Sequence, residues 1–237
     1  MNDFRTALAL LTVLPFAPRN ATVSARALAY YPLIGLIIGL ALAAANFLLR
    51  LFFPALVAAA LLIALWAALT GALHLDGFTD ACDGLFAATT RERRLEILRD
   101  VHLGAFGAVG LILLLLTQVA AVSSLESFAP IVLASVLGRW AMVYAAAYPL
   151  ARREGMAVVF SAGLTRRELL IAMCFAALVA AIFGAFGLAA LVAAFVVATV
   201  IARFVMARLG GLTGDIYGMV CESVEVAVLL VGIAAIR

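Results

Sequence analysis

The sequence predicts an all-α membrane protein, with a single domain over residues 1–237 built as a polytopic bundle of about seven transmembrane helices. Hydrophobic residues make up 68% of the chain and the mean hydropathy is +1.23, whereas soluble domains are about 45–50% apolar. The apolar runs are about twenty residues long, which is the length that an α-helix needs to cross a bilayer. Strands of a membrane barrel would instead be about ten residues long and would alternate in polarity.

The chain begins with a short apolar run, Thr6–Phe16. This run is too short to cross a bilayer and lacks a small-residue cleavage motif, so it predicts a short N-terminal helix that is partly inserted or interfacial. In the first long span, Pro32, Gly35 and Gly39 allow a kink and close helix contact. The sequence leaves open where 169–206 divides and where the last span begins. The seven predicted spans lie at about 28–49, 54–73, 104–122, 128–150, 169–186, 188–206 and 219–236.

The distribution of arginine predicts the orientation in the membrane. All 16 basic residues are arginine, which excludes chemistry that needs a lysine, such as Schiff-base formation. Only Arg50 and Arg237 fall on one predicted side, so the positive-inside rule places the N-terminus and the loops at 74–103, 151–168 and 207–218 in the cytoplasm. The positive charge is then explained by the membrane and by anionic ligands, and we expect no nucleic acid as a partner. The arginines of the cytoplasmic set are Arg5, Arg19, Arg26, Arg91, Arg93, Arg94, Arg99, Arg152, Arg153, Arg166, Arg167, Arg203 and Arg208.

The most informative motif runs from His74 to Gly84 and carries three aspartates in a chain that is only 12% charged. On a helix, Asp76, Asp80 and Asp83 are spaced i, i+4 and i+7, so their carboxylates lie on one face. Like charges at this spacing favour a bound cation, and oxygen ligands suit Mg²⁺ or Mn²⁺. The alternative is that Asp76 caps the helix while the other two aspartates are solvated.

Polar residues around this motif are further candidates for the site. Gly77 leaves backbone room for a phosphate or a tight turn. His74 is a phosphate contact, a proton carrier or a hydrogen-bonded structural residue. Residues 91–100 predict an amphipathic cytoplasmic helix. At its end, where the chain re-enters the membrane, Arg99 and Asp100 are better suited to face a site than lipid.

Charged residues later in the chain extend this set. Arg139 lies in the middle of a predicted span, where a charge costs roughly 2.5–3.5 kcal/mol on insertion scales, so we expect it to face a site or a partner unless it snorkels to an interface. A loop with four glycines contains Gly214 and Asp215, and such a backbone suits contact with phosphate or ribose. Glu222 and Glu225 share one helical face and invite a metal, an arginine or a polar ligand.

Acidic ligands for a hard cation, arginines for anions and a glycine-rich loop all fall on the same predicted side of the membrane. This combination fits phosphoryl transfer, in which the protein mainly positions groups and neutralises charge. The rival class is a cation-coupled transporter. Transporters usually carry internal repeats and binding groups near the middle of the membrane, whereas this sequence shows no repeat and its acids cluster at one face.

Six segments carry motifs that match one known family in the same order: Leu11–Pro15, Tyr31–Gly35, Leu73–Gly84, Leu95–Asp100, Leu103–Gly107 and Gly211–Gly218. In these segments the chain resembles the cobalamin synthases, or adenosylcobinamide-GDP ribazoletransferases. The matches span nearly the whole chain, and the acidic and glycine motifs are specific in combination.

The resemblance implies a Mg²⁺-dependent enzyme of the bacterial inner membrane at a late step of cobalamin biosynthesis. It implies transfer of the phospho-adenosylcobinamide group of adenosylcobinamide-GDP to α-ribazole, or to its 5′-phosphate, with release of GMP. By motif, the three aspartates of residues 76–83 would hold metal at the diphosphate, Arg99 and Asp100 would complete the site, and Gly214 and Asp215 would meet substrate. A homo-oligomer, or an association with other enzymes of this pathway, stays open.

Two positions depart from the family pattern. Val101–His102 stands where Pro or Ser followed by Arg is common, which weakens an expected grip on phosphate, and Val13 stands where Arg is common. A more distant likeness is to CDP-alcohol phosphotransferases, which also place an aspartate set at a cytoplasmic membrane face. That likeness is one of chemistry, and it leaves a lipid-head-group phosphotransferase as the second enzyme class.

Overall fold

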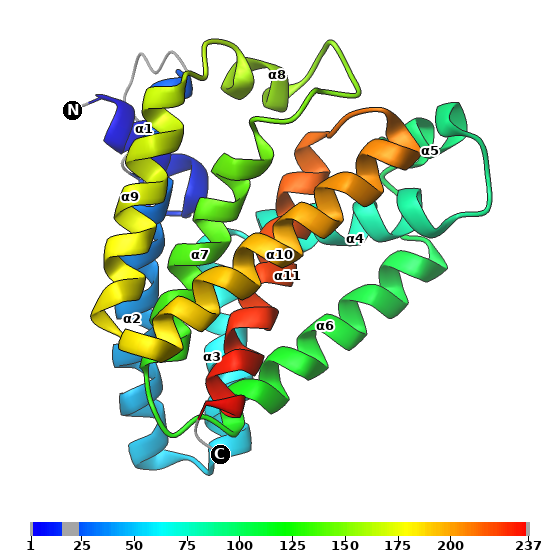
Figure 1. Cartoon of the computed structure of the whole chain (residues 1–237). Coiled ribbons are helices and arrows are strands. Elements are labelled where there is room, and N and C mark those ends of the chain that lie inside the picture. The colour runs from blue at the N-terminus through cyan, green and yellow to red at the C-terminus, as the bar shows by residue number, and fades with distance from the viewer. Residues whose placement is uncertain (1, 16–23, 236–237) are drawn as a thin grey trace.

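The computed structural model describes residues 2–15 and 24–235, and this part of the chain is almost entirely helical (Figure 1). A 3₁₀ helix, η1 (Ala25–Tyr30), precedes α2, and a single isolated β-bridge joins Leu150 to Leu212. The all-α prediction is confirmed. The α-helices are α1 (Asn2–Leu11), α2 (Tyr31–Phe52), α3 (Ala55–Thr70), α4 (Leu73–Phe86), α5 (Arg91–Ile97), α6 (Ala105–Ser123), α7 (Ala129–Ala145), α8 (Met156–Ser161), α9 (Arg166–Ile182), α10 (Gly184–Leu209) and α11 (Gly214–Ala234).

Each predicted span corresponds to a helix, namely α2, α3, α6, α7, α9, α10 and α11. Four helical stretches among the described residues are long and apolar enough to cross a membrane, and the bent pair of α3 and α4 would make a fifth. The helices α7 and α9 are shorter, at 17 residues each. A multi-pass membrane protein is confirmed, while the number of seven crossings stays a prediction.

The centre of the bundle is α7, whose side chains are almost all buried. It packs tightly against α2, because a Cβ added at Gly35 would lie 2.4 Å from the carbonyl oxygen of Ser135. A Cβ at Gly39 would lie 2.8 Å from the Cα of Val132. Small residues let two backbones approach in this way, so the predicted close helix contact is confirmed.

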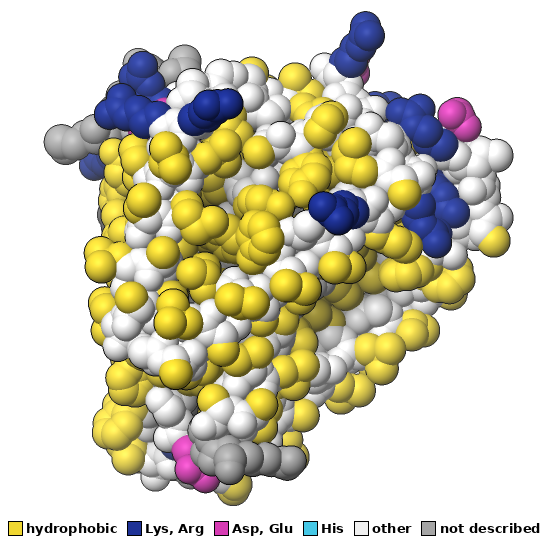
Figure 2. Space-filling model, in the orientation of Figure 1, with side chains coloured by type: hydrophobic (Ala, Val, Ile, Leu, Met, Phe, Trp, Pro, Cys, Tyr) yellow, Lys and Arg dark blue, Asp and Glu magenta, His cyan; other side chains and the backbone are white. Residues whose placement is uncertain are grey.

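The outer faces of the long helices are apolar, as the space-filling view in Figure 2 shows. Phe47 on α2, Leu116 on α6 and Val192 on α10 are 65%, 62% and 63% exposed. Apolar side chains on this scale do not face water in a soluble protein, so lipid is their expected surroundings. Arginine side chains gather mostly toward the end of the bundle that carries α1, α8 and α5 in Figure 1.

A sharp turn separates α3 from α4. Gly71 and Ala72 both have positive φ, at 62° and 55°, and the chain bends by 94°. As a result α4 runs across the bundle instead of continuing the span, and it crosses α11 at two glycines. A Cβ on Gly218 would lie 2.7 Å from the carbonyl oxygen of His74, and one on Gly77 would lie 2.9 Å from that of Asp215. This crossing sets the aspartate motif against the start of α11.

The carboxyl ends of α4 and α10 are closed by arginines. Arg94 and Arg208 both donate to the carbonyl oxygen of Leu85, and the bond from Arg208 measures 2.7 Å. The Nε of Arg91 donates to the carbonyl oxygen of Leu209 at 2.7 Å. Cations at these positions oppose the negative end of the helix dipole. The predicted amphipathic helix exists as α5, and these bonds fix it to its neighbours.

The start of the last helix differs from the expectation. The glycine-rich segment was predicted as a loop up to residue 218, but α11 already begins at Gly214. Asp215 therefore lies in the first turn of this helix, and Glu222 and Glu225 follow on its buried face. Glycine normally weakens a helix, and here the close crossing with α4 explains why Gly218 lies inside one.

Candidate active site

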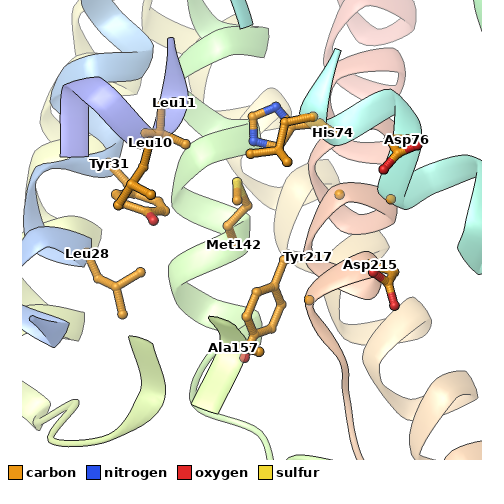
Figure 3. Close-up of a pocket in the computed structure, with 14 residues that line it drawn as sticks. Leu10, Leu11, Leu28, Tyr31, His74, Asp76, Met142, Ala157, Asp215 and Tyr217 are labelled. Carbon is orange, nitrogen blue, oxygen red and sulfur yellow. The ribbon is translucent and has the colours of Figure 1, made fainter. Parts of the chain in front are cut away.

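A cavity of about 200 Å³ lies between the N-terminal helices and the crossing of α4 with α11 (Figure 3). Part of its wall is apolar and includes Leu11, Leu28 and Met142, from α1, η1 and α7. Asp76 and Asp215 lie together on another side of it, as Figure 3 shows. The cavity therefore joins an apolar chamber to a pair of carboxylates.

The cavity brings together residues that are far apart in the sequence, and it gathers several predicted site residues: His74, Asp76, Gly77, Gly214 and Asp215. The N-cap of α4 is Ala72, so the interpretation of Asp76 as a helix cap is not supported. A Cβ at Gly214 would meet nothing within 4 Å, so this backbone borders open space as a ligand contact requires. Gly77 is instead pressed against the backbone of Asp215, which gives it a packing role.

Asp76, Asp80 and Asp215 form an acidic cluster. Burial, followed by the negative charges of three nearby aspartates, raises the pKa of Asp80 to about 6. Asp215 accepts a hydrogen bond from the Thr213 hydroxyl at 3.0 Å and lies 3.8 Å from the Arg152 guanidinium. An excess of negative charge favours a cation. Among the described residues, however, no three His, Cys, Asp or Glu side chains are already grouped as metal ligands, so the metal stays a prediction.

Asp83 has different surroundings from its two neighbours in the motif. It is buried, and its two carboxylate oxygens accept hydrogen bonds from the backbone N–H groups of Gly104 and Gly107, each bond measuring 2.8 Å. These groups lie at the start of α6, where N–H groups have no partner inside the helix. Asp83 thus anchors α6 to α4. Each oxygen keeps a second lone pair, so metal binding by Asp83 is still a prediction but is not its evident role.

Arg99 and Asp100 lie on the exposed surface after α5 and do not line the cavity. Asp100 accepts a hydrogen bond from the backbone N–H of His102 at 3.1 Å and contacts its Nδ1 at 2.6 Å, and these bonds lower the pKa of Asp100. Arg99 lines a surface groove together with Arg152 and Arg153. The structure therefore places Asp100 in a local turn and Arg99 on the arginine-lined side of Asp215.

Arg139 and Glu222 lie inside the bundle and not in the cavity wall. Arg139, for which the sequence favours a place at the site, is 1% exposed and forms an ion pair with Glu225. Glu222 accepts a hydrogen bond from Gln118 at 2.9 Å. Burying such charges is favourable only when they are paired. The structure gives both predicted substrate-binding residues protein partners instead of a place at the cavity.

Two residues at the site had no role in the sequence-based prediction. Arg152 pairs with Asp215 and also donates to the carbonyl oxygen of Leu95 at 2.8 Å, which ties α5 to the start of α11. Tyr217 lines the cavity, and its buried hydroxyl has no partner among the described residues. Arg152 was one of many loop arginines, and only the fold distinguishes it. The position of Tyr217 inside the last matched motif was the only available signal for that residue.

Comparison with known proteins adds a family to this geometry. A family model described as cobalamin-5-phosphate synthase matches residues 3–233. The chain belongs to the cobalamin-5-phosphate synthase family. Membership of the cobalamin-5-phosphate synthases makes it an enzyme, a transferase of cobalamin synthesis, and confirms the family resemblance found in its motifs.

Curated relatives within the cobalamin-5-phosphate synthase family match over almost the full chain. The adenosylcobinamide-GDP ribazoletransferase of Syntrophobacter fumaroxidans is 42% identical over 239 residues, covering 96% of each chain. The protein of that name from Deinococcus radiodurans is 43% identical over 232 residues, covering 94% of this chain and 82% of the relative. No solved structure matches the chain.

Proposed function

We propose that the protein is an adenosylcobinamide-GDP ribazoletransferase, which transfers the phospho-adenosylcobinamide group to α-ribazole or its 5′-phosphate and releases GMP. The observation that carries this proposal is the acidic cluster of Asp76, Asp80 and Asp215, two members of which, Asp76 and Asp215, line the cavity. Relatives with this name match over nearly the whole chain. Carboxylates that hold a metal ion and arginines that bind phosphate supply the positioning and charge neutralisation on which phosphoryl transfer depends.

We propose Mg²⁺ as the cofactor, held by Asp76 and Asp80. The donor set supports this choice, because it offers carboxylate oxygens only. Burial, and after it the charges of the neighbouring aspartates, raise the pKa of Asp80, and a cation would relieve this repulsion. When bound, Mg²⁺ would neutralise the diphosphate oxygens and so assist attack at phosphorus. Asp83 is expected to keep α6 in place behind these two ligands.

The residues of the chain then have separate tasks in the reaction. An acceptor hydroxyl at the carboxylate end of the cavity forms a bond to the phosphorus that carries the cobinamide. The bond from this phosphorus to the bridging oxygen breaks, and GMP leaves with the electron pair. Asp215, oriented by Thr213 and Arg152, accepts the hydroxyl proton. Arg152 is placed to bind a phosphate oxygen of the donor.

The same proposal fixes the protein in the bacterial inner membrane, with the N-terminus and the acidic cluster on the cytoplasmic side. The cavity is lined by residues of α1, α4 and the start of α11. These elements belong to the arginine-rich segments, which the positive-inside rule assigns to the cytoplasm.

The test uses protein purified into lipid nanodiscs, supplied with adenosylcobinamide-GDP, α-ribazole and Mg²⁺, with GMP and the corrinoid product measured by mass spectrometry. We expect Asp76→Ala and Asp80→Ala each to lower turnover by about 10²–10³-fold, and Asp3→Asn on α1 to serve as a matched control. Full turnover by an Asp76→Ala, Asp80→Ala double variant would contradict the proposal. Turnover of a CDP-linked donor with a lipid alcohol, in place of the corrinoid reaction, would favour the CDP-alcohol class.

A further inference from the structure

We propose that the cavity is the binding site for the aromatic base of the acceptor nucleoside, and that the guanine of the donor binds elsewhere. This inference rests on the proposed function and deepens it, because it assigns one substrate to one side of the acidic cluster. Three observations carry it: the chemistry of the wall, its unpaired polar groups, and the charges on either side of Asp215.

The wall of the cavity suits an apolar ring system. Leu11, Leu28 and Met142 contribute aliphatic and thioether surface, and Tyr31 adds an aromatic ring. The benzimidazole base of α-ribazole is flat and apolar, so such a wall can cover it. Guanine carries several hydrogen-bond donors and acceptors, and burying these against leucine would leave them without partners. The size agrees as well, since a cavity of about 200 Å³ is below the usual range for whole ligands and far below a corrinoid.

Two polar side chains in the wall have no partner among the described residues. Tyr217 is 7% exposed and its hydroxyl is unpaired, and His74 is 2% exposed with both ring nitrogens unpaired. Buried polar groups are nearly always hydrogen-bonded, so an unpaired pair at a cavity indicates that a ligand completes them. A nucleoside with an imidazole-type nitrogen and ribose hydroxyls offers suitable partners to a phenol and an imidazole.

The cavity differs from the neighbouring grooves in the charged side chains that line it. The titratable side chains in its described wall are His74, Asp76, Asp215 and two tyrosines, and no arginine is among them. Beyond Asp215, Arg152 and Arg153 line two grooves whose walls also contain Glu92, Glu96 and Glu154, and one of these grooves shares Gly214 and Asp215 with the cavity. A neutral nucleoside is therefore favoured in the cavity, whose described wall has no cation, while the guanidinium groups that can bind a diphosphate lie in the grooves beyond Asp215. The two substrates would meet at the carboxylates between them.

The experiment measures equilibrium binding of α-ribazole alone and of adenosylcobinamide-GDP alone, by calorimetry on protein in nanodiscs. Met142→Trp fills the cavity and should weaken α-ribazole binding at least about tenfold. Tyr217→Phe removes only a hydroxyl and should weaken it about three- to tenfold. Donor binding should change less than about twofold in both variants. The controls are Leu40→Trp, on the exposed face of α2, and Tyr30→Phe, which lies outside the cavity wall.

The outcomes separate this inference from the proposed function. If the wild type turns over the substrates but both variants bind α-ribazole normally, the base lies elsewhere and only the inference is overturned. Loss of donor binding instead of α-ribazole binding would assign the cavity to guanine and also overturn it. A wild type that neither binds α-ribazole nor releases GMP would contradict the proposed function itself. Because Tyr217→Phe is nearly isosteric, it decides the question even if Met142→Trp does not fold.

Discussion

Asp80 and Asp83 show how the surroundings of a residue decide its chemistry. They lie one turn apart on α4 and are the same residue type. Asp83 accepts hydrogen bonds from two backbone N–H groups at the start of α6. Asp80 is half-buried, and burial followed by the charges of neighbouring carboxylates raises its pKa to about 6. The sequence could predict that both lie on one helix face. It could not reveal that backbone N–H groups at the start of α6 would bond to Asp83 and not to Asp80.

The raised pKa of Asp80 predicts a stability effect in the absence of metal. A carboxyl whose pKa is higher in the folded state than its ordinary 3.8 contributes stability below pH 3.8, and this contribution is lost as pH rises through about 6. Asp80→Asn should therefore stabilise the Mg²⁺-free protein at pH 8 by about 1 kcal/mol after solvent screening is allowed for.

Thermal unfolding in nanodiscs at several pH values measures this effect. The gain should disappear at about pH 4, where Asp80 is protonated in the wild type. Glu92→Gln, an exposed carboxylate on α5, serves as the control. A gain of the same size at pH 4 and pH 8 would show that titration of Asp80 is not its cause.

The role of Asp83 predicts a different result. Asp83→Ala leaves the N–H groups of Gly104 and Gly107 without acceptors, which should cost about 1–3 kcal/mol. Asp83→Asn keeps one acceptor oxygen and should cost less. Hydrogen–deuterium exchange should locate the loosening at residues 104–107, and equal exchange there in wild type and Asp83→Ala would rule out the anchoring role.

At the scale of elements, the crossing of α4 and α11 builds the site. The sharp turn at Gly71 and Ala72 directs α4 across the bundle, and Gly77 and Gly218 let it touch α11. Periodicity and apolar length were sufficient to predict the helices. They could not predict the direction of the turn, because that depends on backbone angles and on the packing partner.

Gly218 is the most sensitive position at this crossing. A side chain there meets backbone atoms that cannot move aside, since its Cβ would lie 2.7 Å from the carbonyl oxygen of His74. Gly218→Leu should therefore destabilise the protein by more than about 3 kcal/mol. The matched control is Gly214→Ala on the same helix, where a Cβ has open space, and it should unfold close to the wild-type temperature. Similar melting temperatures for wild type and Gly218→Leu would contradict the close crossing.

For the later helices, the sequence predicted the elements better than their boundaries and the partners of their charged residues. The separate helices α9 and α10 were expected, and the chain divides at Gly184, which has φ of 60°. The start of α11 was placed too late, because glycines in its first turns resemble a loop. Arg139 and Glu222 were predicted at the substrate because charge in a span is costly. Charge alone could not show that Glu225 and Gln118 already satisfy them.

At the scale of the whole molecule, the uneven distribution of arginine predicts the orientation. Arg93 on α5 lies at the arginine-rich end and is exposed, and Glu126 is exposed in the connection between α6 and α7. Cys174 is an exposed free cysteine and is first replaced by serine. In that background, an Arg93→Cys variant should react with a membrane-impermeant maleimide only in inverted vesicles. Glu126→Cys should react in intact cells once the reagent reaches the periplasm. The reversed pattern would place the acidic cluster outside the cell and remove access to cytoplasmic substrates.

The carbonyl oxygen of Leu85 accepts hydrogen bonds from two arginines, Arg94 on α5 and Arg208 on α10. Arg94 also donates to the carbonyl oxygen of Gly84 at 3.1 Å, so the two side chains are not equivalent, but each keeps the Leu85 oxygen hydrogen-bonded when the other is lost. We expect the double variant Arg94→Gln, Arg208→Gln to lose more stability in thermal unfolding than the two single variants lose together. The end of α4 thus keeps an acceptor bond to a neighbouring helix after the loss of either guanidinium.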